Sequence, residues 1–266
     1  MIKVKKTLLY IRQTYPLYLM MLPGALYLLI NNYFPISGLV VAFKNYDYGK
    51  GIWGSDWSGL KNFEFLFKNS TAWVITRNTI LYNLLFIALN TVIGVCIAIL
   101  LNEIRKKTAL KVYQTVILLP YLFSMIIISY VVFAFLSTDT GLLNKGILQP
   151  LGMAPVSWYN EAKYWPIILP IVNTWKAFGF QSIIFFATVV AIDNSYFEAA
   201  QLDGASKLQQ IWFITLPFLK PVVIMMTLLA VGKIFYSDFG LFYNVPMQNG
   251  ALFSVTQTID TYVYRA

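Results

Sequence analysis

Residues 191–217 form the one long polar interruption in the C-terminal half of an otherwise apolar sequence. Ser195 and Glu198 have the spacing of a capping box, in which the serine side chain accepts an amide proton from the third residue of a helix and the glutamate bonds back to the serine amide. This pattern predicts a short helix over about 196–202. Gly204 then ends the helix, because glycine adopts a left-handed backbone without a steric penalty.

A second amphipathic helix is predicted over Ser206–Leu216, and Pro217 is expected to end it. In the first helix, Ala199 and Ala200 have almost no side chain, so another surface can approach closely. A short, rigid helix that is anchored to a membrane span at each end would act as a mechanical lever. The alternative, from physics alone, is an ordinary helical loop in which Gly204 is a plain C-cap.

The sequence carries little of the chemistry of catalysis. It has no histidine, which excludes histidine metal sites and Ser-His or Cys-His catalysis, and its single cysteine, Cys96, lies in an apolar run. No G-x-x-x-x-G-K-[ST] loop is present to cradle nucleotide phosphates. We therefore expect a chain that is not an enzyme and that has no cofactor or metal of its own.

Composition places the polar stretch in a membrane protein. The 266 residues are 58% hydrophobic and 12% charged, whereas soluble domains carry about 25% charged residues. The net charge of +9 comes from basic residues at the ends of apolar segments, so we expect no nucleic acid partner. Runs long enough to cross ~30 Å of hydrocarbon as helices are found at 17–43, 77–101, 112–136, 165–190 and 218–237. The predicted fold is all-α and polytopic, a single transmembrane domain over residues 1–266.

The distribution of basic residues orients these five spans. The segments between them alternate sides, and one side holds ten Lys and Arg in 56 residues while the other holds seven in 87. The richer side consists of 1–16, 102–111 and 191–220, and the poorer side of 44–73, 137–164 and 238–266. Because short cytoplasmic segments carry an excess of Lys and Arg, we expect the N-terminus and residues 191–217 to be cytoplasmic.

The run Glu198-Ala199-Ala200-x-x-Asp203-Gly204-Ala205, followed by Ile214-x-Leu216-Pro217, resembles the EAA loop of permease subunits in binding-protein-dependent ABC importers. The match to this loop includes the E-A-A, the D-G-A, the spacing between them and the I-x-L-P ending. It falls in a segment that the distribution of basic residues predicts to be cytoplasmic. The resemblance implies that residues 191–217, called the coupling loop from here on, fit into an ATPase subunit. The implied coupling residues are Ser195, Tyr196, Glu198, Ala199, Ala200, Asp203, Gly204, Ala205, Leu216 and Pro217.

A further resemblance covers residues 16–67. Pro35-Ile-Ser-Gly-Leu, Phe43-Lys-Asn-Tyr and Gly59-Leu-Lys-Asn-Phe63 are similar to the N-terminal half of carbohydrate permeases, in the branch that handles complex oligosaccharides and polysaccharide fragments. The resemblance implies a type I ABC importer permease fold in a bacterial-type plasma membrane, forming half of a translocation path. The implied partners are a second, homologous permease, two ATPase subunits that bind ATP and Mg²⁺, an extracytoplasmic solute-binding protein and the lipid bilayer. A sixth span is expected beyond the C-terminal end.

Polar residues inside the predicted spans are the candidate substrate contacts, because aromatic rings suit the C–H faces of sugars and amides or charges suit their hydroxyls. A lysine near mid-membrane costs ~2.5–3.5 kcal/mol on insertion scales, so Lys176 should face a cavity or a partner, pair with Asp238, or extend outward. Lys233 raises the same question. The candidates are Asn173, Trp175, Lys176, Gln181, Tyr236 and Asn83.

For Asn83 and Asn90, which lie one heptad apart on one face, hydrogen bonding between helices is favoured over contact with substrate.

The main alternative function is an ABC importer permease for a solute that is not a sugar. A secondary transporter driven by an ion gradient would use membrane carboxylates or histidines, and only Asp238 is available. A membrane-embedded glycan transferase would use paired carboxylates or a metal motif at a membrane border, and neither pattern is present.

Overall fold

The computed structural model describes residues 2–64 and 68–265, and the side chains of residues 14–64 and 68–265. The chain divides into two compact units, residues 1–72 and 73–266. Among the described residues, four helices are long and apolar enough to cross a membrane, or five when one sharply bent pair is counted as a span. This finding agrees with the predicted polytopic all-α fold, and the single domain over 1–266 stays a prediction.

Unit 1 begins with a long helical segment. Helix α1 (Ile2–Leu28) continues into a π-helical turn (Leu29–Tyr33), helix α2 (Phe34–Ile36) and a 3₁₀ stretch (Ser37–Phe43). The apolar part of this segment, Thr14–Phe43, is long enough to cross a membrane, as predicted for 17–43.

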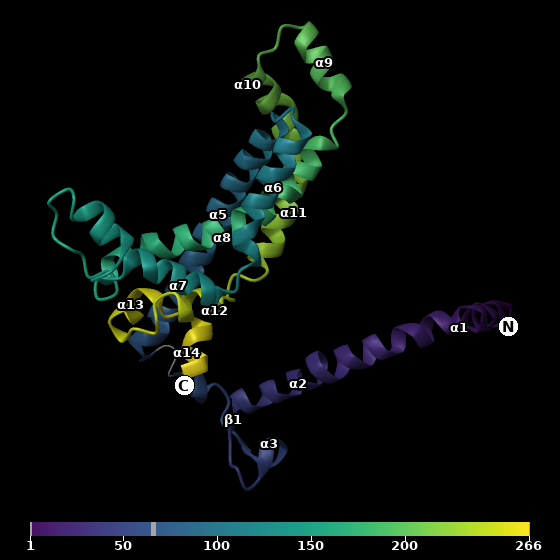
Figure 1. Cartoon of the computed structure of the whole chain (residues 1–266). Helices are drawn as coiled ribbons and strands as arrows, with labels where there is room; N and C mark the ends of the chain where they lie inside the picture. The colour runs from purple at the N-terminus through teal and green to yellow at the C-terminus, as the bar shows by residue number, and fades with distance from the viewer. Residues whose placement is uncertain (1, 65–67, 266) are drawn as a thin grey trace. The chain divides into compact units, whose positions relative to one another are not determined.

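A small hairpin follows in unit 1 (Figure 1). Strands β1 (Lys44–Asn45) and β2 (Asp56–Trp57) pair antiparallel, with Lys44 opposite Trp57, and helix α3 (Gly51–Gly54) lies between them in sequence. A 3₁₀ turn (Lys61–Phe63) follows the second strand. The strands were not predicted, because two residues are too few to show the alternating pattern of a strand.

Unit 2 contains the other long helices. Helices α5 (Ser70–Asn102), α8 (Trp165–Val190) and α11 (Leu216–Val231) correspond to the predicted spans 77–101, 165–190 and 218–237. Helix α11 ends earlier than predicted, because the chain leaves the helix at Gly232 and continues in tight turns up to Tyr236.

The predicted span over 112–136 is broken rather than continuous. Helices α6 (Lys107–Leu122) and α7 (Met125–Leu136) meet at an angle of 97°. Helix α6 ends just after Pro120, and the Ser124 side chain starts α7 by accepting the Ile127 amide proton at 3.4 Å. A proline in the last turn of α6 and a new N-cap four residues later therefore redirect the chain.

The predicted break at Pro217 is absent. Helix α10 (Lys207–Gln210), a π-helical turn (Ile211–Thr215) and α11 form one continuous helix over Lys207–Val231. Pro217 lies in the first turn of α11, where the missing proline amide disturbs a helix least. The coupling loop is consequently continuous with a membrane span.

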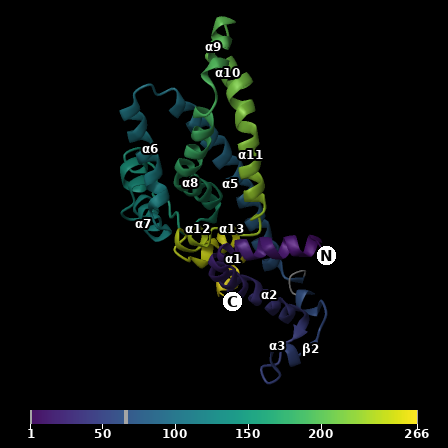
Figure 2. The ribbon, with the colours of Figure 1, turned by 90° about the vertical axis from the view of Figure 1, so that its right-hand side faces the viewer.

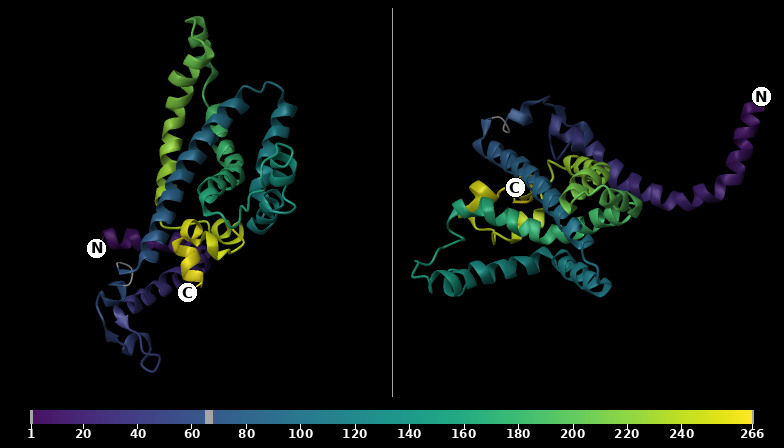
Figure 3. Two further views of the ribbon diagram at one scale, coloured as in Figure 1. Left: turned by 90° about the vertical axis from the view of Figure 1, so that its left-hand side faces the viewer. Right: turned by 90° about the horizontal axis from the view of Figure 1, so that it is seen from above.

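The two ends of unit 2 carry different structures. Helix α9 (Asn194–Leu202) and α10 lie together at one end, while α12 (Phe239–Asn244), α13 (Phe253–Thr256) and α14 (Ile259–Arg265) gather at the opposite end (Figures 1 and 2). The left view of Figure 3 shows the same separation. The coupling loop and the 238–266 segment thus lie at opposite ends of unit 2, as the charge analysis requires.

Two buried clusters hold unit 2 together. One includes Trp165, Leu169 and Phe242, near the α12 end, and the other includes Phe185 and Leu219, where α8 meets α11. Full burial of each such side chain stabilises the fold by ~1.5–3 kcal/mol. These clusters fix α8 as the central helix against which the other elements are positioned.

Helices α6 and α8 approach each other most closely at Gly179. A Cβ atom at this position would lie only 1.8 Å from the carbonyl oxygen of Ile117. Directly after Gly179, the ring of Phe180 stacks on that of Tyr121 with centroids 4.7 Å apart. A small residue thus allows backbone contact between two membrane helices.

Candidate functional site

The coupling loop begins with a helix whose N-terminus is capped two residues earlier than predicted. Asp193 is the N-cap of α9, and its Oδ1 accepts the Ser195 amide proton at 2.9 Å. This hydrogen bond holds the pKa of Asp193 below its ordinary value. The predicted capping box of Ser195 and Glu198 is wrong, because aspartate caps as well as serine and adds a charge that suits the helix N-terminus.

Helix α9 ends in a Schellman motif at Gly204, as the glycine predicted. Gly204 has φ +80°, and two backbone bonds close the turn: Ala205 N–H donates to Ala200 O at 2.8 Å, and Gly204 N–H donates to Gln201 O at 3.0 Å. These bonds satisfy carbonyls that the helix end leaves unpaired.

A capping box does occur in the loop, but at its second helix. Ser206 Oγ accepts the Gln209 amide proton at 3.4 Å, and Gln209 Oε1 accepts the Ser206 amide proton at 2.7 Å. Gln210 Nε2 adds a bond to Ala205 O at 3.1 Å. Both helix ends that face the turn are therefore capped by residues of the loop itself.

The outer face of α9 is open. None of the residues of α9 is buried, and Leu202 is 90% exposed. Tyr196 packs its ring against Phe218 of α11, with centroids 5.3 Å apart, which holds α9 against the continuous helix. An exposed helix with the small residues Ala199 and Ala200 offers a surface for close contact.

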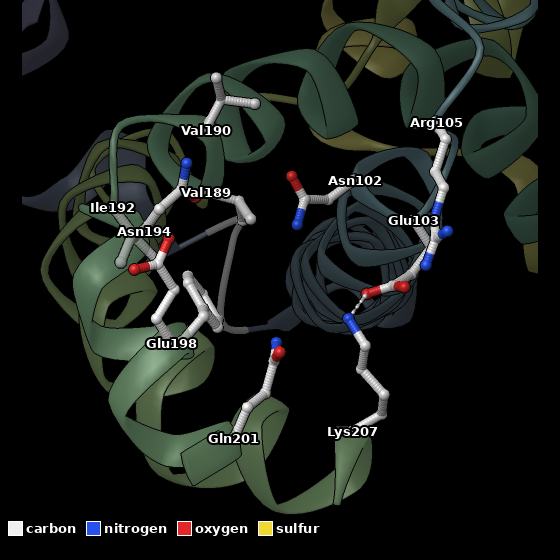
Figure 4. Close-up of a pocket in the computed structure, with 11 residues that line it drawn as sticks. Asn102, Glu103, Arg105, Val189, Val190, Ile192, Asn194, Glu198, Gln201 and Lys207 are labelled. Atoms are coloured by element: carbon white, nitrogen blue, oxygen red, sulfur yellow. Dashed lines mark hydrogen bonds and ion pairs between the residues drawn. The ribbon is translucent and has the colours of Figure 1, made fainter.

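A cavity of about 500 Å³ lies beneath α9 (Figure 4). Its walls come from the ends of α5 and α8, from α9, from the segment after α5 and from the start of α10, and include Asn102, Arg105 and Glu198. Lys207 Nζ lies 3.4 Å from Glu103 Oε1, so an ion pair joins the loop to the segment after α5. Because both side chains are at least half exposed, the pair contributes ~0–1 kcal/mol. Sequence analysis missed this pair, whose partners are far apart along the chain.

A second, smaller cavity of about 250 Å³, called the polar pocket, lies among α5, α8 and α11. Four of the predicted substrate contacts line it: Asn83, Asn173, Gln181 and Tyr236. Residues that sequence analysis did not propose as contacts also line it, namely Phe86, Ile87, Asn90, Thr91, Met226, Ala230, Lys233 and Asp238.

Asparagine side chains build the walls of the polar pocket. Asn83 Nδ2 donates to the carbonyl oxygens of Ile234 and Tyr236 at 2.7 and 2.9 Å, and Asn90 Nδ2 donates to Asn173 Oδ1 at 3.0 Å. The predicted hydrogen bonding between helices is confirmed for Asn90, which joins α5 to α8. Asn83 instead bonds to the turns that follow α11 and fixes them at the edge of the pocket.

Trp175 and Lys176 do not line the polar pocket. Lys176 Nζ instead donates to the carbonyl oxygens of Tyr121 and Phe123, at 3.3 and 2.6 Å, at the bend between α6 and α7. The considered pairing of Lys176 with Asp238 is not formed, because Asp238 caps α12 by accepting the Leu241 amide proton at 3.1 Å. Lys176 thus supplies donors to carbonyls that the broken span leaves free. The roles proposed for both sets of site residues stay predictions.

Comparison with known proteins agrees with this geometry. Residues 90–241 match the family described as "Binding-protein-dependent transport system inner membrane component". The chain is 36% identical over 265 residues to the polygalacturonan/rhamnogalacturonan transport system permease protein YteP of Bacillus subtilis (strain 168), covering 99% of this chain and 81% of YteP.

Solved structures show the same fold. A chain of a bacterial ABC transporter involved in the import of the acidic polysaccharide alginate superposes with a TM-score of 0.88 at 29% identity, covering 98% of this chain and 86% of that one. The alginate transporter in complex with an alginate pentasaccharide-bound periplasmic protein gives a TM-score of 0.86 at 29% identity, covering 96% and 84% of the two chains. With the family match spanning the coupling loop and most of the polar pocket, this chain belongs to the inner membrane components of binding-protein-dependent transport systems, the permease subunits of ABC importers.

Proposed function

We propose that this permease forms half of the translocation path for an oligosaccharide, with its N-terminus and coupling loop in the cytoplasm. A second, homologous permease completes the path, and an extracytoplasmic solute-binding protein delivers the sugar. Two ATPase subunits bind ATP and Mg²⁺ and dock on the coupling loops. The observation that carries the proposal is α9, an exposed, self-capped helix with the EAA sequence at one end of the membrane helices.

The relatives support a carbohydrate as the solute. YteP is a permease of a polygalacturonan/rhamnogalacturonan transport system, and the structural relative imports the polysaccharide alginate. The second structure includes a periplasmic protein with a bound pentasaccharide, which supports delivery by a binding protein.

The continuous helix over Lys207–Val231 supports a route from the ATPase to the substrate. Its 25 residues extend ~37 Å at ~1.5 Å per residue. At one end it follows α9, and at the other end Met226 and Ala230 line the polar pocket. A displacement of α9 by an ATPase therefore moves a wall of the pocket through one rigid element, aided by the contact of Tyr196 with Phe218.

Site-specific cross-linking tests the docking of an ATPase. The exposed Cys96 is first replaced by serine, and Ala199→Cys is introduced on the open face of α9. We expect a cross-link from position 199 to a co-expressed protein that mass spectrometry identifies as a nucleotide-binding subunit. Ala154→Cys, also exposed but in the 137–164 segment, is the matched control and should give no such product. Absence of the product at position 199 in an importer that transports would refute the docking site.

A further inference from the structure

The polar pocket contains an ammonium group without a partner. Within the described part of the chain, Lys233 Nζ makes no hydrogen bond, ion pair or contact with an aromatic ring, although Lys233 lines the pocket. Lys176 shows the contrast, because its ammonium is held by two carbonyl oxygens at 3.3 and 2.6 Å. Lys233 is exposed and lies in the turn that directly follows α11, so its ammonium is free to bind an anionic group that enters the pocket.

Among the described residues that line the pocket, one carries a carboxylate, and it is already engaged. Asp238 accepts the Leu241 amide proton at 3.1 Å as the N-cap of α12 and forms no ion pair with Lys233. Asp260, on α14, accepts both the amide and the hydroxyl of Ser237, each at 2.6 Å. Both acidic groups near the turns after α11 therefore stabilise local structure.

The remaining polar groups of the pocket suit the hydroxyls of a sugar. Asn173 uses its Oδ1 to accept from Asn90, which leaves its amide protons as donors. Asn90 Oδ1 is buried and has no hydrogen-bond partner. Gln181 offers a second amide, and Tyr236, 73% exposed, offers an aromatic ring and a hydroxyl. Besides the Asp238 carboxylate, which is bonded to the Leu241 amide, the cavity thus holds a cation, amides and an aromatic ring, which suit a hydroxylated ligand with one negative charge.

We propose that the polar pocket selects acidic oligosaccharides, with Lys233 binding the carboxylate of a uronate unit and Asn173 and Gln181 binding its hydroxyls. The volume of about 250 Å³ is below the ~300–1,000 Å³ of pockets for drug-sized ligands, so the pocket takes one sugar unit of the chain at a time. This inference rests on the proposed function, because it assigns specificity to the same translocation path.

The test compares acidic sugars with neutral ones of the same shape. The whole importer, in nanodiscs and without binding protein, is titrated with trigalacturonate and trimannuronate and with the methyl ester of each. Loss of a hydrogen bond to a charged group weakens binding by about 10- to 100-fold. We expect the wild type to prefer each acid over its ester by such a factor, and Lys233→Met to abolish the preference. Lys233→Arg, which keeps the charge, should retain it.

The control is Lys220→Met, which removes a lysine from the opposite end of the same helix and should leave the preference unchanged. Equal wild-type binding of acids and esters, no binding of either acid, or an unchanged preference in Lys233→Met would overturn the inference. ATP hydrolysis stimulated by the loaded binding protein is measured on the same nanodiscs. Its presence alongside a failed charge preference refutes only the acidic specificity, whereas its absence in the wild type counts against the proposed function.

Discussion

Replacing Gly204 by valine isolates the contribution of the turn that ends α9. Gly204 has φ +80°, and no atom lies within 4 Å of the place that a Cβ would take, so the substitution changes the backbone preference without a clash. A left-handed conformation costs an L-residue roughly 1–2 kcal/mol, and a β-branched side chain lies at the upper end of that range. The equilibrium between the closed and the open turn then shifts by roughly 5- to 30-fold.

Gly152 provides a matched control for this substitution. It has φ +72° and no atom within 4 Å of its missing Cβ. The turn at Gly152 has the same hydrogen-bond pattern as the turn at Gly204. Met153 N–H donates to Leu148 O at 2.9 Å, and Gly152 N–H donates to Gln149 O at 3.0 Å. Gly152→Val therefore carries the same local cost in the 137–164 segment, away from the coupling loop.

The assay measures membrane insertion, recovery of the ATPase subunits with the purified permease, and sugar uptake. We expect both valine variants to insert like the wild type, and only Gly204→Val to lose ATPase recovery and uptake, by roughly the 5- to 30-fold of the turn equilibrium. Gly204→Asn should retain more activity, because asparagine tolerates the left-handed region. If Gly204→Val retains the ATPase and transports at wild-type levels, the turn does not determine coupling.

Three further changes test other contacts. Gly179→Ala puts a Cβ about 1.8 Å from the Ile117 carbonyl oxygen, so the melting temperature in detergent should fall by several degrees as α6 and α8 separate. Lys176→Met removes the donor for two carbonyls at the bend. Because hydrogen bonds to a charged group contribute ~1.5–3 kcal/mol to stability, the melting temperature of this variant should also fall. The lowered pKa of Asp193, caused by the Ser195 amide, means that its stabilisation of α9 is present above the ordinary aspartate pKa and is lost as the pH falls through the lowered value. The protection of the Ser195 amide from hydrogen exchange, taken relative to its intrinsic exchange rate at each pH, should fall in acid.

Each of these changes has a control on the same chain. Gly146→Ala places its Cβ 3.7 Å from Leu142, an ordinary contact, and should not change the melting temperature. Lys220→Met removes an exposed lysine that has no part in the bend. Asp193→Asn retains a cap but not the titration, so the loss of protection of the Ser195 amide in acid should disappear. Equal melting temperatures for Gly179→Ala and Gly146→Ala, or for the two lysine variants, would contradict the packing and capping arguments.

Apolar length predicted the positions of the spans well, and their directions poorly. Helix α8 begins at Trp165 and ends at Val190, as predicted, because a proline follows its first residue and polar residues begin at Asp193, three residues after its last. The 97° bend at Phe123 and Ser124 escaped prediction because hydropathy reports whether a residue is apolar and not which way the chain runs. The bend also depends on Lys176, which lies more than fifty residues away.

The candidate site shows the same limit at the level of single residues. The motif located the coupling loop and Gly204, but Asp193, Ser195 and Ser206 are all good caps, and only the structure shows that Asp193 and Ser206 are used. Four of the six predicted substrate contacts share the polar pocket. Lys176 does not, because it binds carbonyl oxygens that became available only when a distant span broke.

The caps of the coupling loop have a consequence for how such loops are exchanged. The end of α9 and the start of α10 are closed by the loop's own atoms, through the bonds of Gly204, Ala205 and Ser206. A docking protein therefore has no hydrogen bonds to complete there and has only to fit a surface. We therefore expect the loop to keep its structure when it is transferred to another permease, between two helices with the same spacing. One type of ATPase could then serve permeases that carry different sugars.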